Sequence, residues 1–143
     1  MKAYFDHERL DVYQESIAFC GWVAELLNEI TAKAAAKDQI DRASTSLPLN
    51  IAEGNGKFST ADRARFLEIA RGSALECAAC LDVLAVRKFV SAERIIPAKE
   101  QLVRIVNMLM GMLKRFSGRA EFLREDEGAY SSEQEHEHEQ EHE

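Results

Sequence analysis

The chain has 143 residues, of which 46% are apolar and 30% are charged, so it is long enough to form one domain with a hydrophobic core. No apolar run approaches the roughly 20 residues that a membrane span needs, and the N-terminus becomes charged too early for a secretory signal. Three cysteines, an odd number, argue against a disulfide framework. These features exclude membrane and disulfide-rich classes, and we expect a cytoplasmic protein that has no membrane partner.

The net charge of −7 is distributed unevenly along the chain, which holds 18 bases and 25 acids. From Glu121 onward there are ten acids and a single base, Arg124, so this stretch carries −9. Residues 1–120 keep the other 17 bases and 15 acids, which leaves +2. A body so close to neutral neither demands nor excludes a polyanionic partner.

The first segment with helical spacing runs from about residue 6 to residue 36, and residues 37–38 form a short connection after it. Its apolar positions are separated by alternating steps of three and four, which is typical of a seam in a helix bundle. The stripe consists of Leu10, Tyr13, Ile17, Cys20, Ala24, Leu27 and Thr31.

The second segment covers about residues 39–54 and contains Pro48, which lacks the N–H that would donate to the Ser44 carbonyl. We therefore expect a kink, with the hydroxyls of residues 44–46 as candidates to satisfy the freed carbonyls. The segment ends at the glycine-rich residues 54–56. Its stripe consists of Ile40, Ala43, Leu47, Ile51 and Gly54.

The third segment opens at Ser59 or Thr60, because Ser59 followed by Asp62 resembles a capping box. It ends near residue 86, before a short turn. Its stripe consists of Phe66, Ile69, Ser73, Cys77, Cys80 and Leu84.

The fourth segment follows Ser91, a plausible helix cap. Pro97 is late for a first turn, so either a short helix precedes it or the helix begins near Ile96. The stripe consists of Ile95, Ala98, Leu102, Ile105, Leu109, Met112 and Phe116.

A second apolar stripe accompanies the first on this last segment. It is either part of a wide core face or a subunit interface. We favour the interface, because four exposed large apolar side chains would be a liability on a monomer. The stripe consists of Val103, Val106, Met110 and Leu113.

Four long helical segments with short connections, and none with an alternating pattern, predict an all-α fold. We expect an antiparallel up-down-up-down four-helix bundle over residues 1–122. Residues 123–143 are acidic and of low complexity, and they predict a disordered acidic C-terminal tail.

The residues of common catalytic and metal sites are missing or badly placed. The first 120 residues contain a single histidine, His7, so a di-metal site built on Glu-x-x-His is not expected. Cys77 and Cys80 form a CxxC in the middle of a helix, which favours two small buried residues over a redox pair. We expect no enzymatic activity, no metal, no cofactor and no small-molecule substrate.

Two runs of unusual residues carry a family resemblance. RASTSLPLNIAEG at residues 42–54 and RFLEIARGSALE at residues 65–76 resemble the patterns QIRRAxxSIPxNIAEG and FLxIAxGSxxE of the four-helix-bundle family of 23S rRNA-intervening-sequence proteins. The opening LDVYQES at residues 10–16 also fits, and the resemblance covers about residues 5–118. A more distant similarity is to the accessory variability protein of diversity-generating retroelements. The resemblance implies the bundle, a ring-like homo-oligomer that is a pentamer, and a role with RNA or a nucleoprotein.

Several polar residues of these motifs lie near the seam positions. They either form a polar layer that joins the second and third helices, or they contact a ligand or nucleic acid near Pro48. We favour the structural interpretation, because buried polar groups are costly unless they are paired. The set consists of Arg42, Asn50, Glu53, Ser73 and Glu76.

We therefore expect a non-enzymatic, homo-oligomeric module that binds RNA or a nucleoprotein. The alternative is a protein-interaction scaffold that does not bind nucleic acid. Phosphate contacts would come from basic residues on the helix faces. The candidates are Arg63, Arg65, Arg71 and Arg115.

Overall fold

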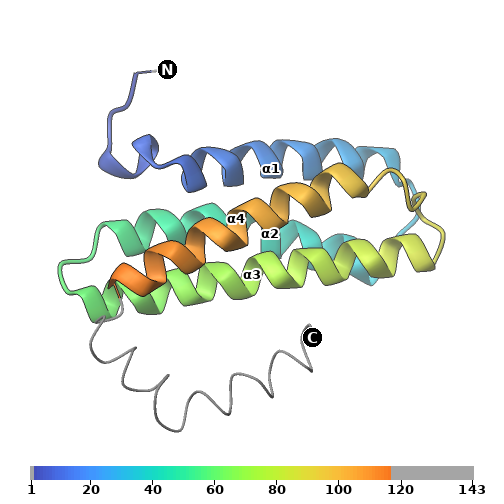
Figure 1. The fold of residues 1–143 in the computed structure, drawn as a ribbon. Helices are drawn as coiled ribbons and strands as arrows, with labels where there is room; N and C mark the ends of the chain where they lie inside the picture. Colours follow the sequence, from blue (N-terminus) through green and yellow to red (C-terminus); the bar gives the residue numbers. More distant parts are fainter. Residues whose placement is uncertain (1, 117–143) are drawn as a thin grey trace, which may run out of the picture.

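The computed structural model describes residues 2–116, which form four α-helices after a short 3-10 helix. Figure 1 shows each α-helix running back along the one before it, in the up-down-up-down order that the sequence predicts. No strand occurs within residues 2–116, which agrees with the all-α prediction. The elements are η1 (Asp6–Arg9), α1 (Asp11–Glu29), α2 (Ala35–Asn55), α3 (Thr60–Val86) and α4 (Ile96–Phe116). The expected disordered tail, residues 123–143, lies outside the described residues.

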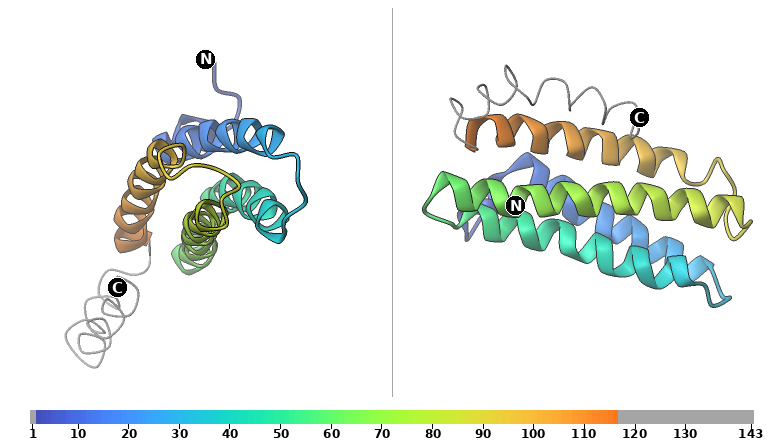
Figure 2. Two further views of the ribbon diagram at one scale, coloured as in Figure 1. Left: turned by 90° about the vertical axis from the view of Figure 1, so that its right-hand side faces the viewer. Right: turned by 90° about the horizontal axis from the view of Figure 1, so that it is seen from below.

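The helices pack in a closed order, in which each one contacts its two neighbours. Helices α1 and α3 both pack against α2 and α4, and the α2–α3 contact is the most extensive. Figure 2 shows this arrangement along and across the bundle. None of the described helices is both long and apolar enough to cross a membrane.

The predicted core faces of α2 and α4 are confirmed, since all their described stripe residues are buried. The predicted face of α1 is wrong by one position: Ile17 is 46% exposed, whereas Phe19 is fully buried. The first half of α3 is displaced in the same way, because Leu67 is buried and Ile69 is 45% exposed. On each of these helices, two neighbouring faces are offset by one residue in the sequence. Both faces carry apolar side chains at steps of three and four, so the spacing alone does not choose between them. The buried residues of α1 are Val12, Ser16, Phe19, Val23 and Leu26.

The first helix is shorter than the sequence predicts, and the predicted connection at residues 37–38 lies inside α2. The chain leaves α1 after Glu29, and α2 begins at Ala35. Alanine-rich residues are strong helix formers, which explains why the sequence pattern runs straight through the turn. The Lys37 ammonium group donates to the carbonyl of Ile30 at 2.5 Å and so joins the start of α2 to the residue that follows α1.

The predicted helix starts are confirmed for the last two helices. The Ser59 hydroxyl accepts the Asp62 N–H at 3.1 Å and caps α3. Helix α4 begins at Ile96, which places Pro97 in its first turn, where its missing N–H is not needed. The Ser91 hydroxyl accepts the Arg94 N–H at 3.1 Å and closes the turn before α4.

Pro48 lies inside α2, and the partner of the freed Ser44 carbonyl is not a neighbouring hydroxyl. The Cys20 thiol on α1 donates to that carbonyl, with a sulfur–oxygen distance of 3.1 Å. The hydroxyls of Ser44 and Thr45 instead donate to the Asp41 carbonyl. The proline therefore creates an acceptor that is satisfied by the adjacent helix.

Candidate functional site

A group of hydroxyl and amide side chains joins α2 to α3 at the middle of their seam. The hydroxyls of Ser46 and Ser73 are hydrogen bonded at 2.8 Å. The Asn50 amide donates to both the hydroxyl and the carbonyl of Ser46, each at 2.9 Å. Because these polar atoms satisfy one another, this group is a structural tie between the helices.

A second group joins the same two helices nearer the start of α2. The Gln39 amide donates to a Glu76 carboxylate oxygen at 2.9 Å, and the Arg42 guanidinium donates to the Gln39 side-chain oxygen. Arg42 and Glu76 are thus brought together through Gln39, which the sequence analysis missed. Its signal was its position one helical turn before Arg42. Glu53 lies outside both groups, since it is exposed and pairs with Lys57 at 3.5 Å.

The three cysteines are free thiols close to the core. Burial, together with the neighbouring Cys80, Glu76 and Cys20 side chains, raises the pKa of Cys77 to about 12. Burial also raises the pKa of the Cys80 thiol. Thiols with raised pKa values are poor nucleophiles at neutral pH, so the CxxC is a pair of small packing residues. Residues 2–116 contain no group of side chains that could hold a metal ion.

The turn between α2 and α3 brings bases and aromatic rings together at one end of the bundle. The Phe58 side chain is fully exposed, at 101% of its reference area. The Phe66 ring contacts two cations, with the Lys57 ammonium 5.0 Å and the Arg65 guanidinium 4.8 Å from the ring centroid. We call the site formed by Lys57, Phe58, Arg63, Arg65 and Phe66 the basic-aromatic turn.

The backbone beneath the basic-aromatic turn is held by a close helix approach. The Arg63 guanidinium donates to the Lys57 carbonyl at 2.7 Å and so fixes the turn to the start of α3. A Cβ atom added at Gly54 would lie 3.0 Å from the Phe66 Cβ and 3.3 Å from the Arg63 carbonyl oxygen. Any side chain at Gly54 would therefore push α3 away from α2 beside the site.

The four arginines named as nucleic-acid candidates are only partly brought together. Arg63 and Arg65 lie in the basic-aromatic turn, where Arg65 also pairs with Asp62 at 3.3 Å. Arg71 lies further along α3 and pairs with Glu68 at 3.3 Å. Arg115 lies in the last turn of α4, at the same end of the bundle as the α2–α3 turn (Figure 1).

The sequence analysis missed the role of the two aromatic rings at this end. It placed Phe66 on a core stripe and gave Phe58 no role. The available signal was a large apolar residue, Phe58, next to a lysine in a turn between two helices, where packing cannot explain it.

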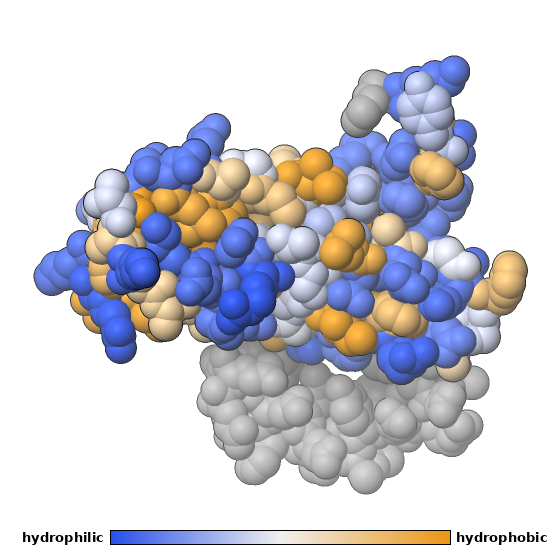
Figure 3. All heavy atoms as spheres, turned by 180° about the vertical axis from the view of Figure 1, so that it is seen from behind, coloured by the Kyte–Doolittle hydropathy of each residue, from blue (hydrophilic) through white to orange (hydrophobic). Residues whose placement is uncertain are grey.

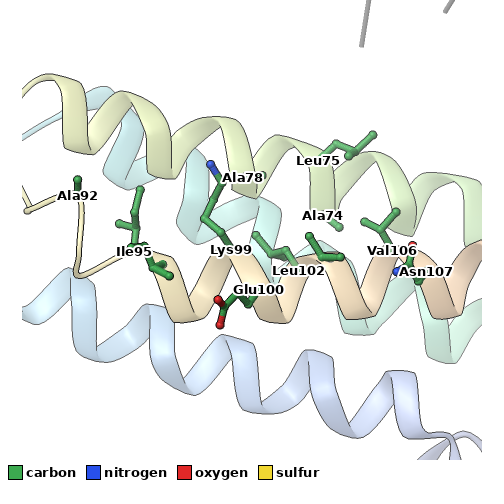
Figure 4. A pocket seen from close by; sticks show the side chains of 12 residues that line it. Ala74, Leu75, Ala78, Ala92, Ile95, Lys99, Glu100, Leu102, Val106 and Asn107 are labelled. Carbon is green, nitrogen blue, oxygen red and sulfur yellow. The ribbon is translucent and has the colours of Figure 1, made fainter. Parts of the chain in front are cut away.

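An apolar groove of about 640 Å³ lies between α3 and α4 (Figure 4). Two of the four predicted interface residues line it: Val103, which is 59% exposed, and Val106, which is half-buried. Met110 is half-buried further along α4, whereas Leu113 is buried in the core. The second stripe of α4 therefore passes from the surface into the core along the helix.

Figure 3 shows apolar side chains among hydrophilic ones on the face seen from behind.

Four helices in sequence order, joined at the α2–α3 seam by polar side chains, define an all-α four-helix-bundle protein. The sequence model of the 23S rRNA-intervening sequence protein family matches residues 8–111, and the chain belongs to this family. This match confirms the resemblance that the two central motifs indicate.

One solved structure supports the same fold. It is the crystal structure of a protein of unknown function from the S23 ribosomal protein family of Bacteroides thetaiotaomicron. The chain is 24% identical to it, with a TM-score of 0.69, and the match covers 72% of this chain and 98% of that one. No curated protein gives a significant match.

Proposed function

We propose that the chain is a non-enzymatic RNA-binding module, which contacts RNA through the basic-aromatic turn. The observation that carries this proposal is the fully exposed ring of Phe58, which lies beside Lys57 in the α2–α3 turn, directly before the first turns of α3 with Arg63 and Arg65. Unpaired nucleobases of RNA stack on exposed aromatic side chains, and neighbouring lysine and arginine side chains bind the phosphates. The membership in a family linked to the 23S rRNA intervening sequence supports RNA as the polyanion.

The acids around the turn do not prevent this role. Glu53 and Asp62 pair with Lys57 and Arg65 at 3.5 and 3.3 Å, and all four side chains keep more than a third of their surface exposed. Exposed ion pairs contribute less than about 1 kcal/mol, so phosphate groups can displace them. Arg63 is held through its Nε atom by the Lys57 carbonyl.

The test is binding of a fluorescent RNA hairpin with an unpaired loop, measured by anisotropy at low and moderate salt. Loss of one stacked base costs roughly 1–3 kcal/mol, so Phe58→Ala should weaken binding about 5- to 150-fold. Arg65→Gln should weaken binding and reduce the salt slope by about one phosphate contact. Val86→Ala is the control, because Val86 is 75% exposed on the last turn of α3, at the other end of the bundle.

Two results would contradict the proposal. The first is that the unaltered chain does not bind the hairpin even at low salt. The second is that Phe58→Ala binds the hairpin as tightly as the unaltered chain and the Val86→Ala control do.

The groove between α3 and α4 supports a second proposal, the self-assembly of the chain that the homo-oligomeric module requires. We propose that copies of the chain assemble through this groove into the pentamer that the family resemblance implies. Its exposed apolar residues include Leu75 at 44%, Ile96 at 50% and Val103 at 59%. A contiguous apolar surface of this kind is typical of an interface between proteins.

Light scattering of Val103→Asp tests this assembly. A carboxylate placed in a buried apolar contact is costly, so the variant should have the 16.1 kDa mass of a single chain. Leu49→Asp is the matched control, because Leu49 is 61% exposed on α2, outside the groove, and its mass should match that of the unaltered chain. A single-chain mass for the unaltered protein would exclude the assembly.

A further inference from the structure

The last described residue of the chain lies at the same end of the bundle as the basic-aromatic turn. Both views in Figure 2 and the view in Figure 1 show the end of α4 beside the start of α3. This proximity follows from the topology, because four helices that alternate in direction bring the end of the fourth back to the second turn. The segment after Phe116 therefore starts next to the basic-aromatic turn.

The charges of the two neighbours are opposite. Residues 117–143 contain ten acids and two bases, and six of the acids are glutamates within residues 133–143. The end of the bundle carries five bases, of which Lys57 and Arg65 pair with the acids Glu53 and Asp62, so these seven residues keep an excess of three positive charges. The five bases are Lys57, Arg63, Arg65, Lys114 and Arg115.

The segment is long enough to cover this end without being stretched. A chain of 27 residues can span up to roughly 90 Å when fully extended, well beyond the roughly 32 Å of a helix with 21 residues. Tethering at this range gives an effective concentration on the order of 1 mM at the turn. A contact with a dissociation constant on the order of 0.1 mM is then mostly formed within one chain.

We infer that the acidic C-terminal segment, residues 121–143, binds the basic-aromatic turn and competes there with the phosphates of RNA. This inference rests on the proposed RNA-binding function. Carboxylates of the segment can take the place of RNA phosphates beside the lysine and arginine side chains. They cannot stack on the Phe58 ring. The segment therefore discriminates against RNA that only makes phosphate contacts and favours RNA with an unpaired base for the Phe58 ring.

The test uses the full chain with the six glutamates of residues 133–143 replaced by glutamine. These positions follow the bundle, so the core is unaltered. An effective concentration on the order of 1 mM against a local dissociation constant on the order of 0.1 mM predicts about tenfold tighter hairpin binding. The gain should shrink as salt is raised. A chain with residues 133–143 in shuffled order keeps the charge and should bind like the unaltered chain.

A synthetic peptide of residues 117–143 separates binding of the segment from general charge repulsion. Added to the glutamine variant, a labelled peptide should bind at low salt, and Lys57→Gln with Arg65→Gln in that variant should abolish the binding. The inference is overturned if the peptide does not bind, or if the glutamine variant and the unaltered chain bind RNA equally well. Peptide binding without any RNA binding would leave the segment's contact in place and contradict the proposed function alone.

Discussion

Gly54 allows α2 and α3 to come close together directly before the basic-aromatic turn. A Cβ atom there would meet the Phe66 Cβ at 3.0 Å and the Arg63 carbonyl oxygen at 3.3 Å, and both partners belong to the first turns of α3. The backbone carbonyl cannot move out of the way without moving α3. The glycine is therefore explained by close packing, since α2 continues through it.

Gly54→Ala should lower the free energy of unfolding by about 1–3 kcal/mol, because overpacking outweighs the gain in helix propensity. Gly21→Ala is the matched control: Gly21 lies inside α1 with no atom within 4 Å of an added Cβ. This control should be more stable than the unaltered chain by about 0.5–1 kcal/mol. Urea unfolding, followed by circular dichroism, measures both changes. A stabilised Gly54→Ala variant would refute the close-packing explanation.

Pro48 shows how far a single residue can be interpreted from the sequence. The spacing identifies the Ser44 carbonyl as the acceptor that loses its donor. The donor that replaces it, the Cys20 thiol, lies 24 residues earlier on another helix. Nothing local in the sequence indicates this pairing, because it depends on the rotation of α1 about its axis. The nearby hydroxyls were the plausible local donors, and two of them bond to Asp41 instead.

At the scale of elements, periodicity predicted which segments are helices better than it predicted which face is buried. The predicted core stripe of α4 was correct, although a second apolar stripe runs beside it. Helix α1 carries apolar residues on two adjacent faces, one with Tyr13 and one with Phe19, and either face could pack against the core. The packing of α2 and α4 on both sides of α1 decides the choice, and a single segment does not contain that information.

The connection between α3 and α4 is attached to the end of α1 by Arg94. Its guanidinium donates to the two Glu29 carboxylate oxygens at 3.1 and 2.8 Å. It also lies 4.9 Å from the centroid of the ring of Trp22, the only tryptophan in the chain. The hydrogen bonds from Arg94 hold the pKa of Glu29 below its ordinary value of 4.5. Arg94 therefore joins the α3–α4 connection to α1 at the end opposite the basic-aromatic turn.

The contact should respond to acid. Because the pKa of Glu29 is lower in the folded chain, its stabilising contribution is complete above pH 4.5 and is lost as the pH falls through the folded pKa. Trp22 fluorescence should report the release of Arg94 in that acidic range. In Glu29→Gln the transition should be absent, while Glu25→Gln should retain it. A transition of equal size in Glu29→Gln would show that another group is responsible.

At the scale of the whole molecule, the two central motifs predicted the family and the four-helix bundle. The candidate site was harder to predict from the sequence, because the exposed Phe58 ring lies in a turn and is not part of any periodic pattern. Lys57 and Arg65 come to lie against the same Phe66 ring only when the glycine at position 54 lets α3 pack closely on α2. The groove follows the same rule, since its position is set by the packing of α3 against α4 and not by its own residues alone.

An even number of alternating helices gives the molecule a polarity. Helix η1, the end of α4 and the second turn lie at one end, so the proposed RNA contact and its proposed competitor share that end (Figure 1). The first and third connections, residues 30–34 and 87–95, lie at the opposite end. A dye, a surface tether or a fused domain attached within these two connections would leave the basic-aromatic turn accessible. If copies assemble side by side in one orientation, the resulting ring has two unlike rims.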